Sequence, residues 1–122
     1  MSTYLDKFRM KFFKKKQQIK QLIPQSMNIG CMASNRITVD GARVGYMYRE
    51  ENDSQYPDSG WTFFAGDEDE EYTANADNFH VFELNTICNY DPSIIPYLNL
   101  PYGIALIRNG EDFEMENLEP MG

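Results

Sequence analysis

Hydrophobic and polar residues alternate over much of the middle of the chain, at the spacing typical of β-strands. Two such runs, Ile37 to Val39 and Val44 to Tyr48, flank the dipeptide Asp40-Gly41. Because Asp-Gly between β-forming runs favours a tight turn, this stretch predicts a β-hairpin. A polar loop over residues 50–60 then leads to Trp61 to Ala65, which predicts the next strand.

The residues that follow carry helix signals. The acidic run after Gly66, together with Tyr72 to Ala76, predicts a short helix, whereas Phe79 to Leu84 fits either a strand or the exit of that helix. Asp91 followed by Pro92 is typical of a helix start, since Asp caps free N–H groups and Pro is tolerated at the first helical position. We therefore expect a second short helix from Pro92 onward.

The last part of the chain predicts two more strands. Gly103 to Ile107 and Phe113 to Met115 have strand character, and Asn109-Gly110 between them favours a tight turn. Strands and helices thus follow one another without regular βαβ alternation. The predicted fold class is α+β, an antiparallel sheet with short helices and an N-terminal amphipathic helix.

That N-terminal helix is expected to end before Pro24. Its apolar residues fall near one helical face, with lysines elsewhere: Leu5, Phe8, Phe12, Ile19 and Ile23. The basic face favours docking on the acidic remainder of the chain, because the opposite charge is already present there, and a membrane surface or an acidic partner is the alternative. The expected organisation is a basic helix over residues 1–24, a linker over 25–30 and a single α+β domain over 31–122.

The composition is that of a folded domain with an uneven charge. Of the 122 residues 42% are hydrophobic and 14% aromatic, which suffices for one domain with a core. The net charge is −8, and because residues 1–20 carry about +6, the remainder carries about −14. Such a body repels nucleic acid and anionic lipid at long range, so the partner we expect is a basic protein. The sequence leaves the oligomeric state open.

Several kinds of chemistry lack the residues that they need. Cys31 and Cys88 have neither metal-binding nor redox spacing and are expected in the core. His80 lies in an apolar run, where we expect a structural role rather than a catalytic one. We find no glycine-rich phosphate loop, no secretory signal and no apolar stretch of ~18 residues. We therefore expect no cofactor, no membrane span and a cytoplasmic location.

Five consecutive carboxylates, Asp67 to Glu71, directly follow the strand-like run that ends at Ala65. Adjacent like charges repel one another, so we interpret the run as a surface that a partner neutralises. A solvated loop or the first turn of a helix is the alternative interpretation. A calcium loop starting at Asp67 fails, because Tyr72 stands where Gly is needed and Asn78 where Glu is needed, and we predict no metal site.

Three segments of the chain resemble a bacterial protein family: GYMYRE at 45–50, DSGWTFFAGDE at 58–68 and LNTICNYDP at 84–92. This family is the domain of unknown function numbered 2185, also called immunity protein family thirty-three of polymorphic toxin systems. The resemblance runs from about Cys31 to Arg108, so the basic N-terminal helix lies outside it. It implies a non-enzymatic cytoplasmic protein that binds a cognate toxin.

Charge and resemblance lead to the same hypothesis, an immunity protein that neutralises a toxin through an acidic surface. Many antibacterial toxins are nucleases with basic clefts, which a rigid acidic surface can occupy as a phosphate mimic. The predicted partner-binding residues are the acidic run and nearby aromatic residues: Asp67, Glu68, Asp69, Glu70, Glu71, Tyr72 and Trp61. Trp61 also fits the core of its strand.

Two other functions stay open from the sequence. A small-ligand-binding or regulatory module would show a deep apolar pocket lined by Arg49, Trp61 and Asp67. A hydrolase would use carboxylates such as Asp67, Glu68 and Glu83, but nothing in the sequence fixes the distance between them.

Overall fold

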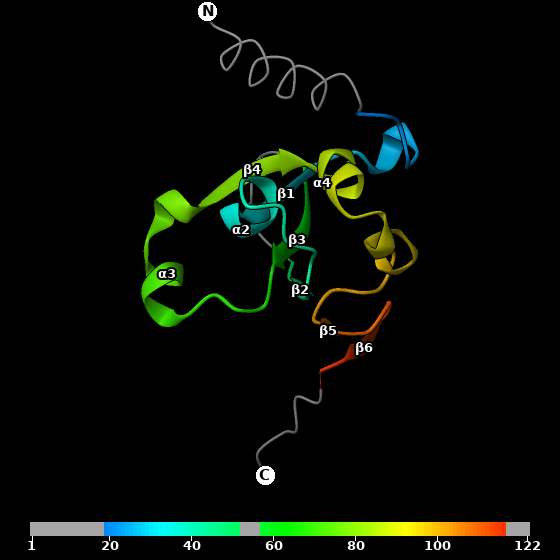
Figure 1. The fold of residues 1–122 in the computed structure, drawn as a ribbon. Helices are drawn as coiled ribbons and strands as arrows, with labels where there is room; N and C mark the ends of the chain where they lie inside the picture. The colour runs from blue at the N-terminus through cyan, green and yellow to red at the C-terminus, as the bar shows by residue number, and fades with distance from the viewer. Residues whose placement is uncertain (1–18, 52–56, 117–122) are drawn as a thin grey trace, which may run out of the picture.

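The computed structural model describes residues 19–51 and 57–116, and Figure 1 shows their arrangement. The described residues form a sheet of six strands, β1 (Gly30–Ser34), β2 (Tyr46–Arg49), β3 (Asp58–Phe64), β4 (Phe79–Glu83), β5 (Ala105–Asn109) and β6 (Asp112–Met115). The α-helices are α2 (Asn35–Thr38), α3 (Glu70–Ala74) and α4 (Leu84–Tyr90). The 3₁₀ helices are η1 (Gln25–Met27), η2 (Ala76–Asn78) and η3 (Pro92–Tyr97).

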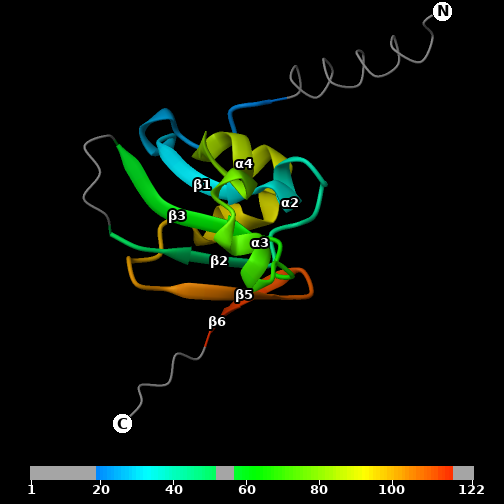
Figure 2. The same ribbon diagram turned by 90° about the vertical axis from the view of Figure 1, so that its left-hand side faces the viewer.

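The strands lie in the order β4-β1-β3-β2-β5-β6. Neighbouring strands are antiparallel except for β1 and β3, which run parallel. In Figure 1, α4 and η3 lie to the right of the strands and α3 lies to their left. Figure 2 looks from that left-hand side, with β3, β2 and β5 running across the view. The predicted α+β class is confirmed, with one parallel pair that the sequence did not indicate.

One face of the sheet and the helices beside it enclose the hydrophobic core. The strand residues that point into it are at most 2% exposed: Cys31, Ala33, Met47, Trp61, Phe63 and Leu106. They pack with equally buried residues of α2, α4 and η3: Ile37, Leu84, Ile87, Cys88 and Ile94. The interpretation of Trp61 as a core residue of its strand and the prediction that Cys31 and Cys88 lie in the core are confirmed.

The predicted hairpin at Asp40-Gly41 is wrong, because Asn35–Thr38 forms helix α2 instead of a strand. The Ser34 hydroxyl accepts a hydrogen bond from the N–H of Arg36 and so caps the start of the helix. At its end Gly41, with a φ of 82°, donates to the carbonyl of Ile37. Ile37 is fully buried, so core packing outweighs the β propensity of its run.

The later elements follow the sequence more closely. α3 begins within the acidic run, η3 begins at Pro92 with Asp91 as its cap, and β5 and β6 pair as predicted. Phe79–Glu83, for which two structures were open, is strand β4. Helix α4 was not predicted, because it follows that strand directly and begins without a capping side chain.

The predicted N-terminal helix falls mostly on residues 1–18, which lie outside the described residues. Residues 19–24 contain no helix, and Ile23 lies in the core at 4% exposure. The backbone N–H of Leu22 donates to the side-chain oxygen of Asn85 at 2.8 Å. The predicted linker contains η1, and its last residue, Gly30, begins β1. A helix long and apolar enough to cross a membrane does not occur among the described residues.

The register of β3 against β1 shifts at the start of β3, which marks a β-bulge there. Trp61 follows this bulge and points into the core. Asp58 Oδ1 accepts from the N–H of Gly60 at 2.7 Å, and Ser59 Oγ donates to the carbonyl of Gly30 at 2.7 Å. Gly60 has a φ of 83°, and a Cβ there would lie 2.2 Å from the carbonyl oxygen of Glu50. Only glycine fits this position.

Candidate functional site

The acidic run forms the turn after β3 and the first turn of α3. The Glu68 carboxylate accepts hydrogen bonds from the backbone N–H groups of Ala65 and Gly66, both at 2.8 Å. Burial by itself raises the pKa of Glu68, but these bonds and one from the Ser34 hydroxyl outweigh it and hold the pKa below its ordinary value. Glu68 therefore stabilises the turn itself.

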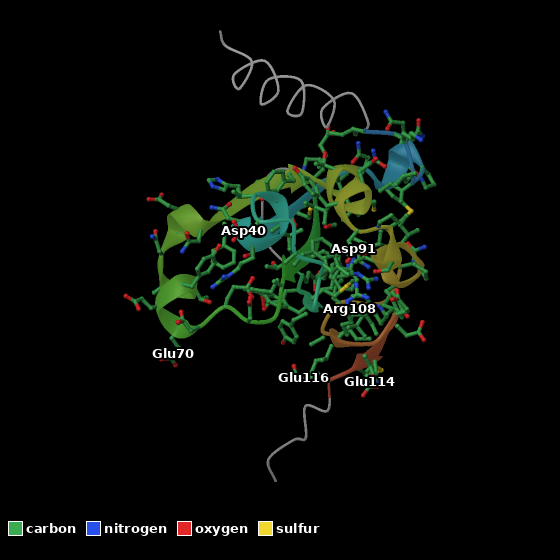
Figure 3. All side chains as sticks on the ribbon, viewed as in Figure 1. Asp40, Glu70, Asp91, Arg108, Glu114 and Glu116 are labelled. Carbon is green, nitrogen blue, oxygen red and sulfur yellow. The ribbon has the colours of Figure 1, made fainter. Side chains whose placement is uncertain are left out.

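Two of the other carboxylates also have partners within the chain. Asp69 caps α3, since its Oδ1 accepts from the N–H of Tyr72 at 2.8 Å. Asp67 forms an exposed ion pair with Arg36, with 3.5 Å between the carboxylate oxygen and Nε. Glu70 and Glu71 are exposed in the first turn of α3, and Figure 3 shows Glu70 pointing away from the body of the protein. These last two carboxylates are the most available to a partner.

We expect Glu68→Gln to lower the free energy of unfolding at pH 7 by roughly 1 kcal/mol, because it weakens charge-assisted hydrogen bonds. The pKa of Glu68 lies below its unfolded value of about 4.5 in the folded protein. Its contribution is therefore complete above about pH 4.5 and is lost as the pH falls through the folded-state pKa. Urea denaturation of both proteins at pH 7 and pH 3 checks this. The exposed Glu71→Gln is the control, and an equal difference for Glu68→Gln at the two pH values would contradict the assignment.

Trp61 is the predicted partner-binding residue that the structure removes from the surface. Its side chain is 1% exposed, and its Nε1–H donates to the carbonyl of Leu98 at 3.1 Å. A partner cannot reach so enclosed a ring without unfolding β3, so the interpretation as an anchor is wrong and the core interpretation holds.

Aromatic side chains continue from the acidic run across the outer face of the sheet. Tyr72 of α3 meets Phe79 edge-on, with ring centroids 6.0 Å apart, and Phe79 lies 5.5 Å from Phe64. Phe64 in turn lies 5.9 Å from both Tyr46 and Tyr48. We call these five residues the aromatic row, and rings at such distances stabilise one another beyond their burial. The row joins the predicted Tyr72 to four residues that the sequence did not single out.

The arginines of the body have partners within the chain. Beyond residue 20 the Lys and Arg residues of the sequence are Arg36, Arg43, Arg49 and Arg108. Three of them form ion pairs with carboxylates, and Arg49 donates to backbone carbonyls, the shortest bond being 2.6 Å to Leu100. The body therefore presents an excess of negative charge that its own arginines do not neutralise.

A groove of about 350 Å³ lies beside the aromatic row, lined in part by Tyr46, Tyr48 and Arg49. A small-ligand pocket was expected to be lined by Arg49, Trp61 and Asp67. Of these residues only Arg49 lines this groove, and its guanidinium already donates hydrogen bonds to backbone carbonyls. Within residues 19–51 and 57–116, no three His, Cys, Asp or Glu side chains gather as metal ligands. The contacts of the site thus consist of an acidic turn and aromatic rings.

A family model for the immunity protein Imm33 domain matches residues 31–119, which include the acidic run and the whole aromatic row. The chain belongs to the Imm33 family. The resemblance read from its sequence is thereby confirmed. No curated protein and no solved structure matches the chain.

Membership in the Imm33 family indicates a role in immunity to a toxin. Part of the aromatic row could be predicted from the sequence, because side chains in a strand alternate between the two faces of the sheet. In β2 this alternation puts Tyr46 and Tyr48 on one face, and in β3 it puts Phe64 on the face opposite to that of Phe63. The strand order, which places Phe79 and Tyr72 beside these rings, could not be predicted, because it depends on pairing between distant segments.

Proposed function

We propose that this Imm33 protein neutralises a cognate bacterial toxin in the cytoplasm by binding a basic surface of it, without catalysis, through the acidic run and Tyr72. Charge is the observation that carries the proposal. Glu70 and Glu71 are exposed on α3, whereas the arginines of the body have partners within the chain. A basic cleft, such as a nuclease needs to hold phosphates, is complementary to that surface.

A growth assay tests the proposal. Each toxin encoded beside the gene is produced in a bacterial host with and without this protein, and we expect growth to be restored for one of them. Purified protein is then titrated into that toxin at fixed activity. A binding inhibitor reaches its end point near one equivalent, whereas inactivation by a small fraction of an equivalent would contradict the absence of catalysis. Growth restored for none of the toxins would overturn the proposed function.

The steering role of the acidic run calls for variants that leave the fold intact. Glu68 and Asp69 support the turn and the helix, so they are unsuitable. We expect Glu70→Gln with Glu71→Gln to slow association with the toxin severalfold at low salt and to flatten its salt dependence, because charges at the rim act chiefly on the association rate. Stopped-flow kinetics over a range of salt concentrations measures both.

The matched control removes the same charge elsewhere, as Asp40→Asn with Glu111→Gln. Both residues are exposed and lie outside the acidic run and the strands. An association rate equally reduced in both double variants would mean that the overall net charge, and not the acidic run, steers the encounter.

A further inference from the structure

The face of the sheet that α4 and η3 leave uncovered carries apolar side chains where an exposed sheet usually carries polar ones. Strand alternation and register place these residues on it: Met32, Tyr46, Tyr48, Thr62, Phe64, Phe79, Val81, Ala105 and Ile107. We call this surface the open face, and Figure 2 looks toward it. It contains the aromatic row except for Tyr72, which lies at its end on α3.

The register arranges the open face in continuous lines across the strands. Val81 pairs with Met32, Met32 with Thr62, Thr62 with Tyr48, and Tyr48 with Ala105. A second line runs from Phe64 through Tyr46 to Ile107. Val81 is 68% exposed, Ile107 41% and Met32 40%. Single exposed apolar residues scattered over a surface are common, whereas a contiguous apolar surface of this kind marks an interaction site.

Carboxylates lie at the β6 side of the open face and in the groove beside it. Glu114 pairs with Ile107 at one side, the Tyr46 hydroxyl donates to Glu116 at 2.9 Å, and Figure 3 shows both glutamates at the edge of the sheet. Glu50 lines the groove beside Tyr46 and Tyr48. Lysine, which discourages association at exposed sheets, occurs among the described residues only at Lys20, outside the sheet. Protein–protein interfaces are enriched in aromatic residues and Met and depleted in lysine, and the open face has this composition.

We propose that the open face is the surface that docks the toxin, and that its occupant is a toxin surface with an apolar centre edged by Lys and Arg. This rests on the proposed function and extends it from the acidic run to the sheet. Tyr48 and Phe64 supply the rigid apolar contact, and the carboxylates beside the face, with Glu70 and Glu71 at one end, pair with the basic edge. The groove beside Glu50 accepts an Arg side chain, whose apolar stem lies along the tyrosine rings and whose charge meets the carboxylate.

The experiment compares two double variants with identical substitutions. Val81→Ser with Ile107→Ser changes the open face, at exposures of 68% and 41%. Val39→Ser with Ile19→Ser changes residues outside the sheet, at 69% and 46%. The probe is the toxin that the wild-type protein neutralises, carried as an inactive variant, and its dissociation constant is measured together with both rate constants.

We expect the open-face variant to bind at least about tenfold more weakly, mainly through faster dissociation, and the control to stay within about twofold. Melting curves that match the wild type show that both variants fold, and Tyr48→Ala provides a second test at the centre of the face. If the wild type neutralises a toxin but the open-face variants bind it as the wild type does, the docking surface is wrong and the proposed function stands. If the wild type neutralises none, both fall. Sedimentation of the protein alone that shows a dimer abolished by the open-face variant would assign the face to a second copy instead.

Discussion

Replacing Trp61 by alanine is expected to lower the free energy of unfolding by about 3 to 5 kcal/mol, a large part of the stability of a domain of this size. The indole is 1% exposed, stacks on Phe63 with ring centroids 6.0 Å apart and donates to the carbonyl of Leu98. Its removal leaves a cavity beside the central strand β3 and takes away the shorter of the two hydrogen bonds to the carbonyl of Leu98, which then keeps only the one from Arg49 at 3.4 Å. Urea denaturation followed by circular dichroism measures the loss.

The control for this variant is Val81→Ala, which removes an apolar side chain that is 68% exposed on β4. Its expected effect is within about 0.5 kcal/mol, as for most surface substitutions. A loss below about 1 kcal/mol for Trp61→Ala would mean that the core tolerates its absence, and the bulge that turns Trp61 inward would lose its explanation.

The strand around Trp61 was predictable because local signals and tertiary packing agree there. A polar loop precedes it, and β-forming residues follow at the right spacing. At Ile37 they disagree. Its neighbours have β propensity and Asp40-Gly41 suggests a hairpin, but the Ser34 cap and burial of Ile37 select a helix. The Ser34 cap could be predicted from the sequence. The burial of Ile37 could not, because it depends on contact between α2 and α4.

The acidic run shows the same division between local and distant information. That it would begin a helix followed from its composition, and Asp69 serves as the cap of that helix. That Asp67 would pair with Arg36, and that Glu68 would bond to Ser34 in addition to its local bonds, did not follow, because Ser34 and Arg36 come from a segment far away in the sequence. Strand order likewise determines which rings meet in the aromatic row. Charge pattern alone therefore overestimated how many of the five carboxylates are available to a partner.

Asp91→Ala is expected to destabilise the protein by about 3 kcal/mol, because it leaves the half-buried Arg108, with a side chain 13% exposed, without its counter-charge. Asp91 is 3% exposed, and its Oδ2 accepts at 2.8 Å both from Arg108 and from the backbone N–H of Val44. Figure 3 shows Asp91 and Arg108 close together at the junction of η3 with the sheet. Arg108 also donates to the carbonyl of Val44 at 2.6 Å, so the pair holds the segment before β2 against β5 and η3.

A double-mutant cycle separates the interaction energy of the ion pair from the cost of leaving one charged side chain without its partner. We expect Asp91→Ala with Arg108→Met to be less destabilising than Asp91→Ala alone, since no unpaired charge remains at this position. The exposed pair of Arg43 and Glu111 provides the control, and Glu111→Ala is expected to leave the denaturation midpoint nearly unchanged. If the double variant is as unstable as the sum of its single changes, the two side chains act independently and the pair does not hold the segment. Because Arg108 lies on β5 next to Ile107, this network also stabilises the strand that carries part of the open face.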